Sequence, residues 1–338
     1  MTVLVDRRRA LGLLVTAPAA LWANSVRSGT SVGAAPARSS VGVDGVWRWA
    51  DGREVALFGV NYNIASASAF RFAKATGIPF EQIVDTDFAH FKRLGFTALR
   101  LSYWGDWESS SANGSLVENE HLAVLDMVVA RASESGISCL LSPIVTYDAS
   151  WPDALGRPRT GLSHAFDKDI LGTDGAAITA EVRYIGALLA RVNQRTGRRL
   201  ADEPSIVAVE PINEPTHHAG DRAGSVRYIN SLAKAVRDSG FSGPIFYNVT
   251  QDMAMAGAIA AANVQGATFA WNPTGLRTGR AVASNGLLLV EGYRQFDAAD
   301  TMGRYFYPAM VREFRAGGAQ YAAMFAYYSM AIAASNSD

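Results

Sequence analysis

The sequence contains very little that could cross-link the chain or bind a metal. Among its 338 residues there is one cysteine, Cys139, inside the apolar run "ISCLLSPI". An intramolecular disulfide is therefore excluded, and we predict a buried structural thiol rather than a nucleophile. CxxC and HExxH spacings are both absent. We therefore expect neither a metal nor another cofactor.

Net charge is also lacking. Lys plus Arg and Asp plus Glu number 31 each, which gives a formal net charge of zero, and no basic block stands out. A nucleic-acid partner is not expected, because binding a phosphate backbone requires a concentrated positive patch. Hydrophobic residues make up 49% of the chain, which is enough for the core of a large domain.

Long hydrophobic runs are missing too, and the longest apolar stretch near the start is informative for that reason. Arg7, Arg8 and Arg9 precede an apolar segment, residues 10–22, that is too short to span a bilayer comfortably. "RRRAL" resembles a twin-arginine export signal, and "APA" ending at Ala37 is a candidate cleavage site. We expect residues 1–40 to be signal and linker, and the mature protein to be periplasmic or extracellular without stable membrane insertion. An uncleaved membrane anchor is the alternative.

From residue 41 to residue 338 we expect a single domain in which strands alternate with helices. Eight strand-like runs lie between Phe58 and Ser329, which predicts an α/β fold of the (β/α)₈ barrel type. The alternative is a doubly wound open sheet, which should carry a Gly-rich turn after its first strand, and "GVNYNIASAS" is not such a turn. Only residues 330–338 follow the eighth run. We therefore expect the barrel to lack its final helix at the C-terminus.

Polar and aromatic residues stand at the ends of these predicted strands. The run "IVAVEPINEP", residues 206–215, is mostly apolar and ends in Asn213 and Glu214. In a parallel barrel all strands present their carboxyl ends at one mouth, where the chemistry is located. Aromatic rings stack on sugar rings, and amides and carboxylates bind their hydroxyls. The predicted mouth residues also include Arg100, Tyr62, Trp104, Tyr247, Trp271, Glu291 and Tyr327.

These residues carry a family resemblance. "NEP" after the fourth strand, Arg100 in the second and a Glu near the end of the seventh resemble the clan A glycoside hydrolases, especially the family 5 cellulases and mannanases, over the chain from about Gly45 onward. The resemblance implies that Glu214 is the general acid/base, that Asn213 binds the substrate 2-hydroxyl, and that Arg100 orients the nucleophile. At the third strand some relatives have a histidine where this chain has Ser142, which leaves the sugar preference open.

The nucleophile is ambiguous in the sequence. "LLLVEG" places Glu291 at the end of the seventh strand, the position of the family's nucleophile. The downstream stretch "FDAADTMGRYFYPAM" resembles one that directly follows "YEF" in some members, and here that triplet reads "RQF". On this second alignment the position is Gln295, an amide that cannot attack, and the true seventh strand is absent. A third candidate is Asp297.

We therefore predict an exported retaining glycoside hydrolase that cleaves β-linked glucan or mannan with two carboxylates, Glu214 and Glu291. Tyr62, Trp104, Tyr247, Trp271 and Tyr327 are predicted to bind the carbohydrate together with Arg100 and Asn213. The alternative is a non-hydrolytic glycan-binding barrel, or an inactive fragment that has lost the nucleophile. A carboxylate separation of about 5 to 5.5 Å marks the retaining geometry.

Overall fold

A computed structural model describes residues 39–145, 161–216, 222–249, 255–270, 290–292, 312 and 315–332 of the chain. The predicted export segment, residues 1–40, lies outside this part except for its last two residues. Ser39 and Ser40 belong to a short strand, β1 (Ser39–Val41), which pairs antiparallel with β2 (Trp47–Trp49). The first described strand therefore begins two residues before the predicted boundary, which itself stays a prediction.

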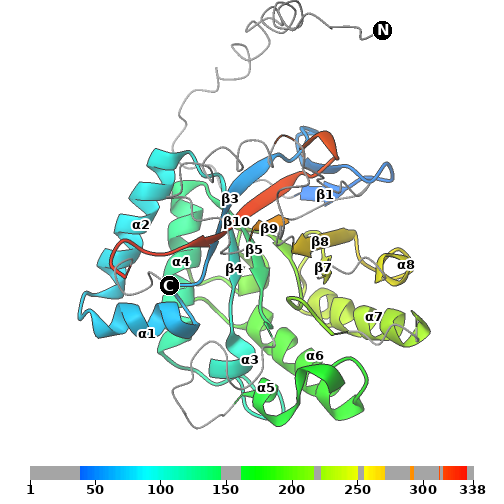
Figure 1. Cartoon of the computed structure of the whole chain (residues 1–338). Helices are drawn as coiled ribbons and strands as arrows, with labels where there is room; N and C mark the ends of the chain where they lie inside the picture. The colour runs from blue at the N-terminus through cyan, green and yellow to red at the C-terminus, as the bar shows by residue number, and fades with distance from the viewer. Residues whose placement is uncertain are drawn as a thin grey trace, which may run out of the picture. The chain divides into compact units, whose positions relative to one another are not determined.

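The centre of the fold is a sheet of parallel strands. Its strand order in the described part of the chain is β6-β5-β4-β3-β10-β9-β8-β7, eight strands in all (Figure 1). Chain neighbours are thus sheet neighbours, without the reversal of order that a doubly wound sheet requires. The strands are β3 (Leu57–Tyr62), β4 (Ala98–Ser102), β5 (Ser138–Ser142), β6 (Ile206–Val209), β7 (Phe246–Val249), β8 (Gly266–Ala270), β9 (Val290–Gly292) and β10 (Tyr321–Tyr327).

The two edge strands of this sheet also meet. Val209 and Ile245 form an isolated parallel bridge, and the Val209 amide donates to the carbonyl of Pro244 at 3.1 Å. The sheet therefore curves until β6 lies beside β7, as in a (β/α)₈ barrel. We call this join the β6–β7 seam. The predicted fold class is confirmed.

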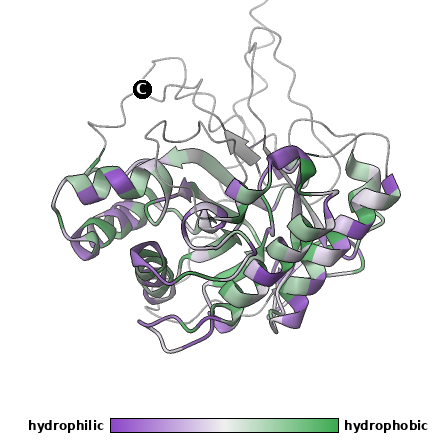
Figure 2. Ribbon diagram, turned by 90° about the horizontal axis from the view of Figure 1, so that it is seen from below, coloured by the Kyte–Doolittle hydropathy of each residue, from purple (hydrophilic) through white to green (hydrophobic). Residues whose placement is uncertain are grey.

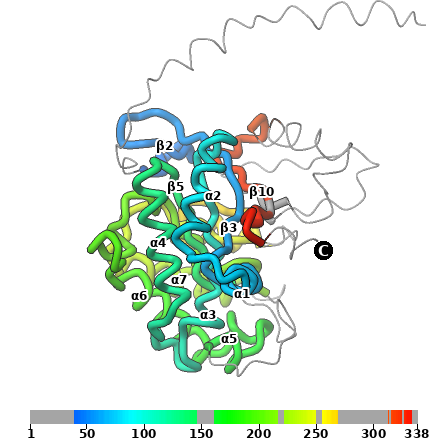
Figure 3. The backbone as a smooth tube through the Cα atoms, turned by 90° about the vertical axis from the view of Figure 1, so that its left-hand side faces the viewer, coloured from blue at the N-terminus to red at the C-terminus, as the bar shows by residue number. Residues whose placement is uncertain are grey.

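Helices follow the strands and cover the outside of the sheet (Figures 1 and 3). Figure 2 shows hydrophobic and hydrophilic residues alternating along them, as expected where one face packs on a sheet. Two helices end at glycines in the left-handed conformation: α2 at Gly95 and α4 at Gly136. The helices are α1 (Ala67–Ala75), α2 (Phe80–Leu94), α3 (Gly105–Glu108), α4 (Glu120–Ser135), α5 (Leu162–Ala165), α6 (Gly175–Ala190), α7 (Arg222–Asp238) and α8 (Ala256–Ile259), with 3₁₀ turns η1 (Lys168–Ile170) and η2 (Leu200–Asp202).

Two cores result from the alternation of side chains along the strands. The larger one fills the layer between sheet and helices and includes Cys139, so the predicted buried thiol is confirmed; burial raises its pKa. The smaller one fills the lower barrel interior, where Trp47 packs edge-on against Phe246 with ring centroids 5.2 Å apart. Gln320 seals this floor, accepting from the Trp47 amide at 2.7 Å and donating to the Val55 carbonyl at 3.0 Å.

Candidate active site

A connected group of buried polar side chains lies at the carboxyl-end half of the barrel interior. Each member comes from a barrel strand or from the segment that follows it, and all are at most 5% exposed. Their hydrogen bonds link six neighbouring strands into one network. We call this group the mouth cluster; it consists of Asn61, Arg100, Ser102, Ser142, Glu210, Asn213, Asn248 and Thr268.

Strand alternation explains why these residues face inward. On β7, Phe246 packs in the barrel floor and Asn248, two residues later, reaches Glu210. Tyr247 between them lies in the sheet–helix core. Because side chains alternate along a strand, adjacent residues at the same strand end face different layers. The end of a strand therefore does not by itself place a side chain at the mouth.

An ion pair between Arg100 and Glu210 forms the centre of the mouth cluster. Arg100 Nη2 donates to Glu210 Oε1, and Ser142 Oγ donates to the same oxygen at 2.9 Å. The other oxygen, Oε2, accepts from Thr268 Oγ1 and, at 3.3 Å, from Asn248 Nδ2. A fully buried carboxylate is tolerated when a cation and hydrogen-bond donors surround it, as they do here.

The same guanidinium fixes Asn213. Arg100 Nη2 donates to Asn213 Oδ1 at 2.7 Å, while Nη1 donates to Asn61 Oδ1 at 2.8 Å and to Ser102 Oγ at 2.6 Å. The backbone amide of Asn213 donates to the Ile144 carbonyl at 2.8 Å, which connects it to the segment after β5. The Asn213 side chain is therefore oriented with its oxygen toward Arg100 and its NH₂ group the other way.

Glu214 lies at the edge of the mouth cluster and is partly exposed. Its φ of +41° falls in the left-handed region, which residues with a side chain rarely adopt. Its amide donates to Asn248 Oδ1 at 2.8 Å. Asn248 thus contacts Glu210 through its NH₂ group and Glu214 through its oxygen.

Three residues predicted from the "NEP" motif and the second strand come together in this structure. Asn213 and Glu214 follow β6, and Arg100 on β4 contacts Asn213 directly. Arg100 also pairs with Glu210, a carboxylate that was not predicted at the site, and its role in orienting the nucleophile stays a prediction. The Arg100–Glu210 pair is fully buried.

Glu291 is placed by backbone register. β9, which contains it, lies between β8 and β10, in the seventh position of the barrel. Glu291 is level with Ala270 on β8 and with Ala323 on β10, and Ala323 belongs to the barrel-floor core. The predicted seventh strand is therefore present. The rival positions Gln295 and Asp297 lie outside the described residues, as does Trp271.

Two of the tyrosines predicted at the mouth lie instead against helix α2. The Tyr62 hydroxyl donates to Asp87 Oδ2 at 2.7 Å, and the Tyr327 hydroxyl contacts Asp87 Oδ1 at 3.2 Å and His90 Nδ1 at 2.8 Å. Ser329 Oγ also donates to Asp87, at 3.0 Å. These contacts lie in the sheet–helix core. Tyr62 and Tyr327 therefore point out of the barrel, away from the mouth where they were predicted to contact carbohydrate.

Tyr247 is corrected for the same reason. It is fully buried between β7 and the helices, where burial and the nearby Glu181 carboxyl raise its pKa. Trp104 follows β4 on the mouth side, but its ring is buried in a small apolar group with Ala67 and Val145. The three predicted tyrosines therefore lie outside the mouth, and Trp104 packs in an apolar group beside it.

Glu210 and Thr268 were not predicted from the sequence as members of the site. Glu210 lies in the same quoted run as Glu214, where it was read as part of an apolar strand. A carboxylate inside such a run requires a buried cation, and Arg100 lies inside another strand. That pairing is the signal that could have identified Glu210.

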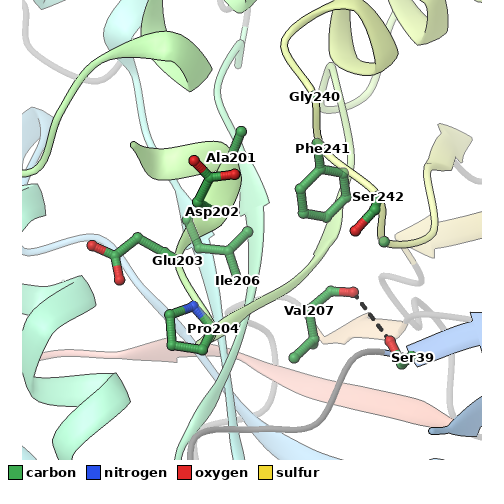
Figure 4. A pocket seen from close by; sticks show the side chains of 11 residues that line it. Ser39, Ala201, Asp202, Glu203, Pro204, Ile206, Val207, Gly240, Phe241 and Ser242 are labelled. Carbon is green, nitrogen blue, oxygen red and sulfur yellow. Dashed lines mark hydrogen bonds between the residues drawn. The ribbon is translucent and has the colours of Figure 1, made fainter. Parts of the chain in front are cut away.

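A separate pocket of about 310 Å³ lies at the opposite end of the barrel (Figure 4). It is bordered by η2, the start of β6 and the segment after α7, and Ser39 Oγ donates across its edge to the Val207 carbonyl at 3.4 Å. Glu203 borders it, and burial raises the pKa of its carboxyl. Ile206 at this pocket and Glu210 at the mouth cluster stand at opposite ends of β6, so the pocket is not part of the candidate site.

In the described residues, no group of three His, Cys, Asp or Glu side chains is arranged to hold a metal ion. Nor does that part of the chain contain a helix long and apolar enough to cross a membrane.

Comparison with solved structures places the fold among glycoside hydrolases. An endo-1,4-β-mannanase from Rhizomucor miehei matches with a TM-score of 0.62 at 16% identity, covering 85% of this chain and 90% of that one. A glycoside hydrolase family 5 mannosidase from the same organism matches with a TM-score of 0.58 at 13% identity, covering 87% of each chain. The resemblance to family 5 found in the sequence is thus confirmed for the fold.

Among characterised sequences, a mannan endo-1,4-β-mannosidase 2 from rice, Oryza sativa subsp. japonica, is 30% identical over 142 residues. The match covers 36% of this chain and only 30% of the rice protein. No protein-family model matches the chain.

Proposed function

We propose that this protein is a retaining glycoside hydrolase that cleaves β-1,4-linked mannan, with Glu214 as acid/base and Glu291 as nucleophile. The observation that carries the proposal is the mouth cluster, in which Arg100 and Asn248 hold Asn213 and Glu214 at the carboxyl end of β6. Mannan is preferred over glucan because the rice relative and the structural neighbours are named as mannanases and mannosidases.

In the proposed first step the Glu291 carboxylate attacks the anomeric carbon. The bond from that carbon to the leaving oxygen breaks, and Glu214 transfers its proton to this oxygen. The result is a glycosyl ester on Glu291, a free sugar hydroxyl and an ionised Glu214.

In the second step Glu214 acts as a base. It takes a proton from a water molecule, whose oxygen attacks the anomeric carbon and breaks the ester bond. The sugar leaves with the original anomeric configuration, and both carboxyl groups return to their starting states.

Asn213 and Arg100 support this chemistry. Because Arg100 occupies the Asn213 oxygen, the Asn213 NH₂ group is oriented to donate to a sugar hydroxyl. A hydrogen bond of this kind that strengthens in the transition state contributes to the rate. Arg100 itself is buried and acts through Asn213.

The test is turnover of mannan and of aryl β-mannosides and β-glucosides by the full chain. We expect Glu214→Ala and Glu291→Ala each to lower kcat by several orders of magnitude, since either carboxylate is essential to double displacement. Glu134→Ala, at an exposed ion pair with Arg131 on α4, is the matched control and should leave the rate unchanged.

Two other outcomes would contradict parts of the proposal. Full activity of Glu291→Ala would reassign the nucleophile. Binding of mannan oligosaccharides by a folded chain without any turnover would support the alternative, a glycan-binding barrel.

We also propose that the protein is exported. The support is the triple arginine, residues 7–9, ahead of a short apolar stretch, residues 10–22. Arg7 and Arg8 changed together to lysine should retain the precursor in the cytoplasm, which fractionation and N-terminal sequencing of the processed chain will check. Unchanged processing of that variant would contradict twin-arginine export.

A further inference from the structure

We infer that Asn248 is a positioning residue for the acid/base Glu214, and that Glu210 and Thr268 fix its orientation. This inference rests on the function proposed above. Asn248 belongs neither to the "NEP" motif nor to the strand of the predicted nucleophile, because it lies on β7.

Hydrogen bonds on both sides fix the orientation of the Asn248 amide. Its Nδ2 donates to Thr268 Oγ1 at 2.8 Å and to Glu210 Oε2 at 3.3 Å. Since both neighbours accept from it on one side, the Asn248 oxygen must face the other side, where the Glu214 amide donates to it at 2.8 Å. Asn248 is fully buried, and these bonds use both ends of its side chain.

The backbone of Glu214 is held in an unusual conformation. With φ of +41°, Glu214 adopts a conformation that is unfavourable for a residue with a Cβ atom. Such a conformation persists when surrounding contacts hold it in place. The Asn248 bond acts on the amide of Glu214 itself and therefore on the direction in which its carboxyl group leaves the chain.

The hydrogen bonds of Asn248 cross from one barrel strand to the next. Glu214 follows β6 and Asn248 lies on β7, so the bond crosses the β6–β7 seam. The hydrogen bond from Asn248 Nδ2 to Glu210 Oε2 is a second bond across the same seam. The position of the acid/base thus depends on side chains from the adjoining strand.

Leaving-group dependence separates a positioning role from a structural one. A phenyl leaving group needs a proton from the acid/base, whereas 2,4-dinitrophenolate leaves without one. If Asn248 positions Glu214, Asn248→Ala should lower kcat/KM for a phenyl β-mannobioside about 100-fold and for the 2,4-dinitrophenyl analogue much less. Glu214→Ala should show the same pattern more strongly.

Two further variants sharpen the test. Thr268→Val removes the hydroxyl that orients Asn248 while keeping a similar volume, so it should shift the rates in the same direction by about 3- to 10-fold. Asn193→Ala is the matched control. Asn193 is also buried, and its Oδ1 accepts a hydrogen bond from the Arg195 backbone amide at 2.8 Å, in the turn between α6 and β6. It should leave the ratio of the two rates unchanged.

Hydrogen exchange of residues 211–216 provides a readout that does not need turnover. We expect faster exchange at the Glu214 amide in Asn248→Ala and in Thr268→Val, and wild-type exchange there in Asn193→Ala. Equal loss of rate on both mannobiosides in folded Asn248→Ala, or unchanged exchange at Glu214, overturns the inference alone. A wild-type chain that exchanges as expected but cleaves neither glycoside overturns the proposed function, and the catalytic role of Asn248 with it.

Discussion

Buried carboxyl groups occur on both sides of the barrel wall and are accommodated in different ways. Inside the barrel, Glu210 is paired with Arg100 and receives further hydrogen bonds from three strands. In the helix layer, Glu181 on α6 accepts from the Tyr228 hydroxyl at 3.0 Å, and burial raises its pKa well above the ordinary value. Asp87 on α2 is bound by hydroxyl groups, and its pKa is also raised by burial.

This difference shows what each carboxyl group can do. A buried acid that meets only hydroxyl groups is stabilised by holding a proton, and it can then act as a hydrogen-bond donor or acceptor within the packing. A buried carboxylate that is paired with a guanidinium keeps its charge and orients other polar groups around it. Glu210 in the barrel interior thus has a guanidinium partner, whereas Glu181 and Asp87 in the helix layer are bound by hydroxyl groups. Asp126 on α4 is a helix-layer carboxylate that does have a guanidinium partner, Arg191.

The largest expected effect is that of removing the charge on one side of the interior pair. Glu210→Ala removes a carboxylate that pairs with the buried Arg100 guanidinium, which should lower the free energy of unfolding by about 3–5 kcal/mol. Denaturant unfolding measures this loss. The double variant Arg100→Leu with Glu210→Leu should lose less unfolding free energy than the summed losses of Arg100→Leu and Glu210→Leu measured singly. Additive losses would contradict the pairing.

The pH dependence of stability tests the helix-layer acids. Because the folded-state pKa of Glu181 is raised above 4.5, its stabilising contribution is complete below that pH and is lost as the pH rises toward the folded-state value. Glu181→Gln removes this loss, so the stability of the variant relative to wild type should rise with pH, by at most about 1.4 kcal/mol per pH unit. Unfolding curves at several pH values between 4 and 8 check this. Parallel curves for the two proteins would mean that Glu181 is ionised in the fold.

Tyr62→Phe tests the assignment of the outward tyrosines. It removes the hydroxyl that donates to Asp87, so we expect a loss of about 1–2 kcal/mol in the free energy of unfolding. Its kcat/KM on mannan should stay within about twofold of wild type, because the ring faces α2. A large rise in KM with unchanged stability would return Tyr62 to the substrate site.

The smallest effect should come from an exposed ion pair, which gives a baseline for the buried one. Lys234 and Asp238 lie one turn apart on α7 and are solvent-exposed. Exposed pairs contribute little because water and salt screen them. Lys234→Gln should therefore leave the unfolding curve unchanged, and a clear loss would imply that the α7 surface is covered in the working protein.

The positions of the strands could be predicted from the sequence, because apolar runs bounded by turn residues indicated the barrel and where each strand ends. Whether an individual side chain at a strand end points into or out of the barrel could not be predicted. Tyr247 and Asn248 are neighbours at the same strand end, yet one lies outside the sheet and the other inside. That choice depends on the pairing of β7 with β8, where Asn248 is level with Thr268, and pairing is a long-range property.

Asn213 and Glu214 could be singled out from the sequence because a short motif carries them, and the structure shows Asn213 in contact with Arg100. Glu210 was missed because a single acid in an apolar run has no local explanation. Its partners Arg100, Ser142 and Thr268 come from separate strands, and only the closed arrangement brings them together.

The β6–β7 seam has a consequence for how this barrel tolerates change. The described backbone joins these strands through one bridge, at Val209 and Ile245, while Asn248 reaches across to Glu210 and Glu214. The last join between strands is thus made in part by the same amide that holds the backbone of Glu214. If Glu214 is the acid/base as proposed, a substitution that separates β6 from β7 should also displace its carboxyl group.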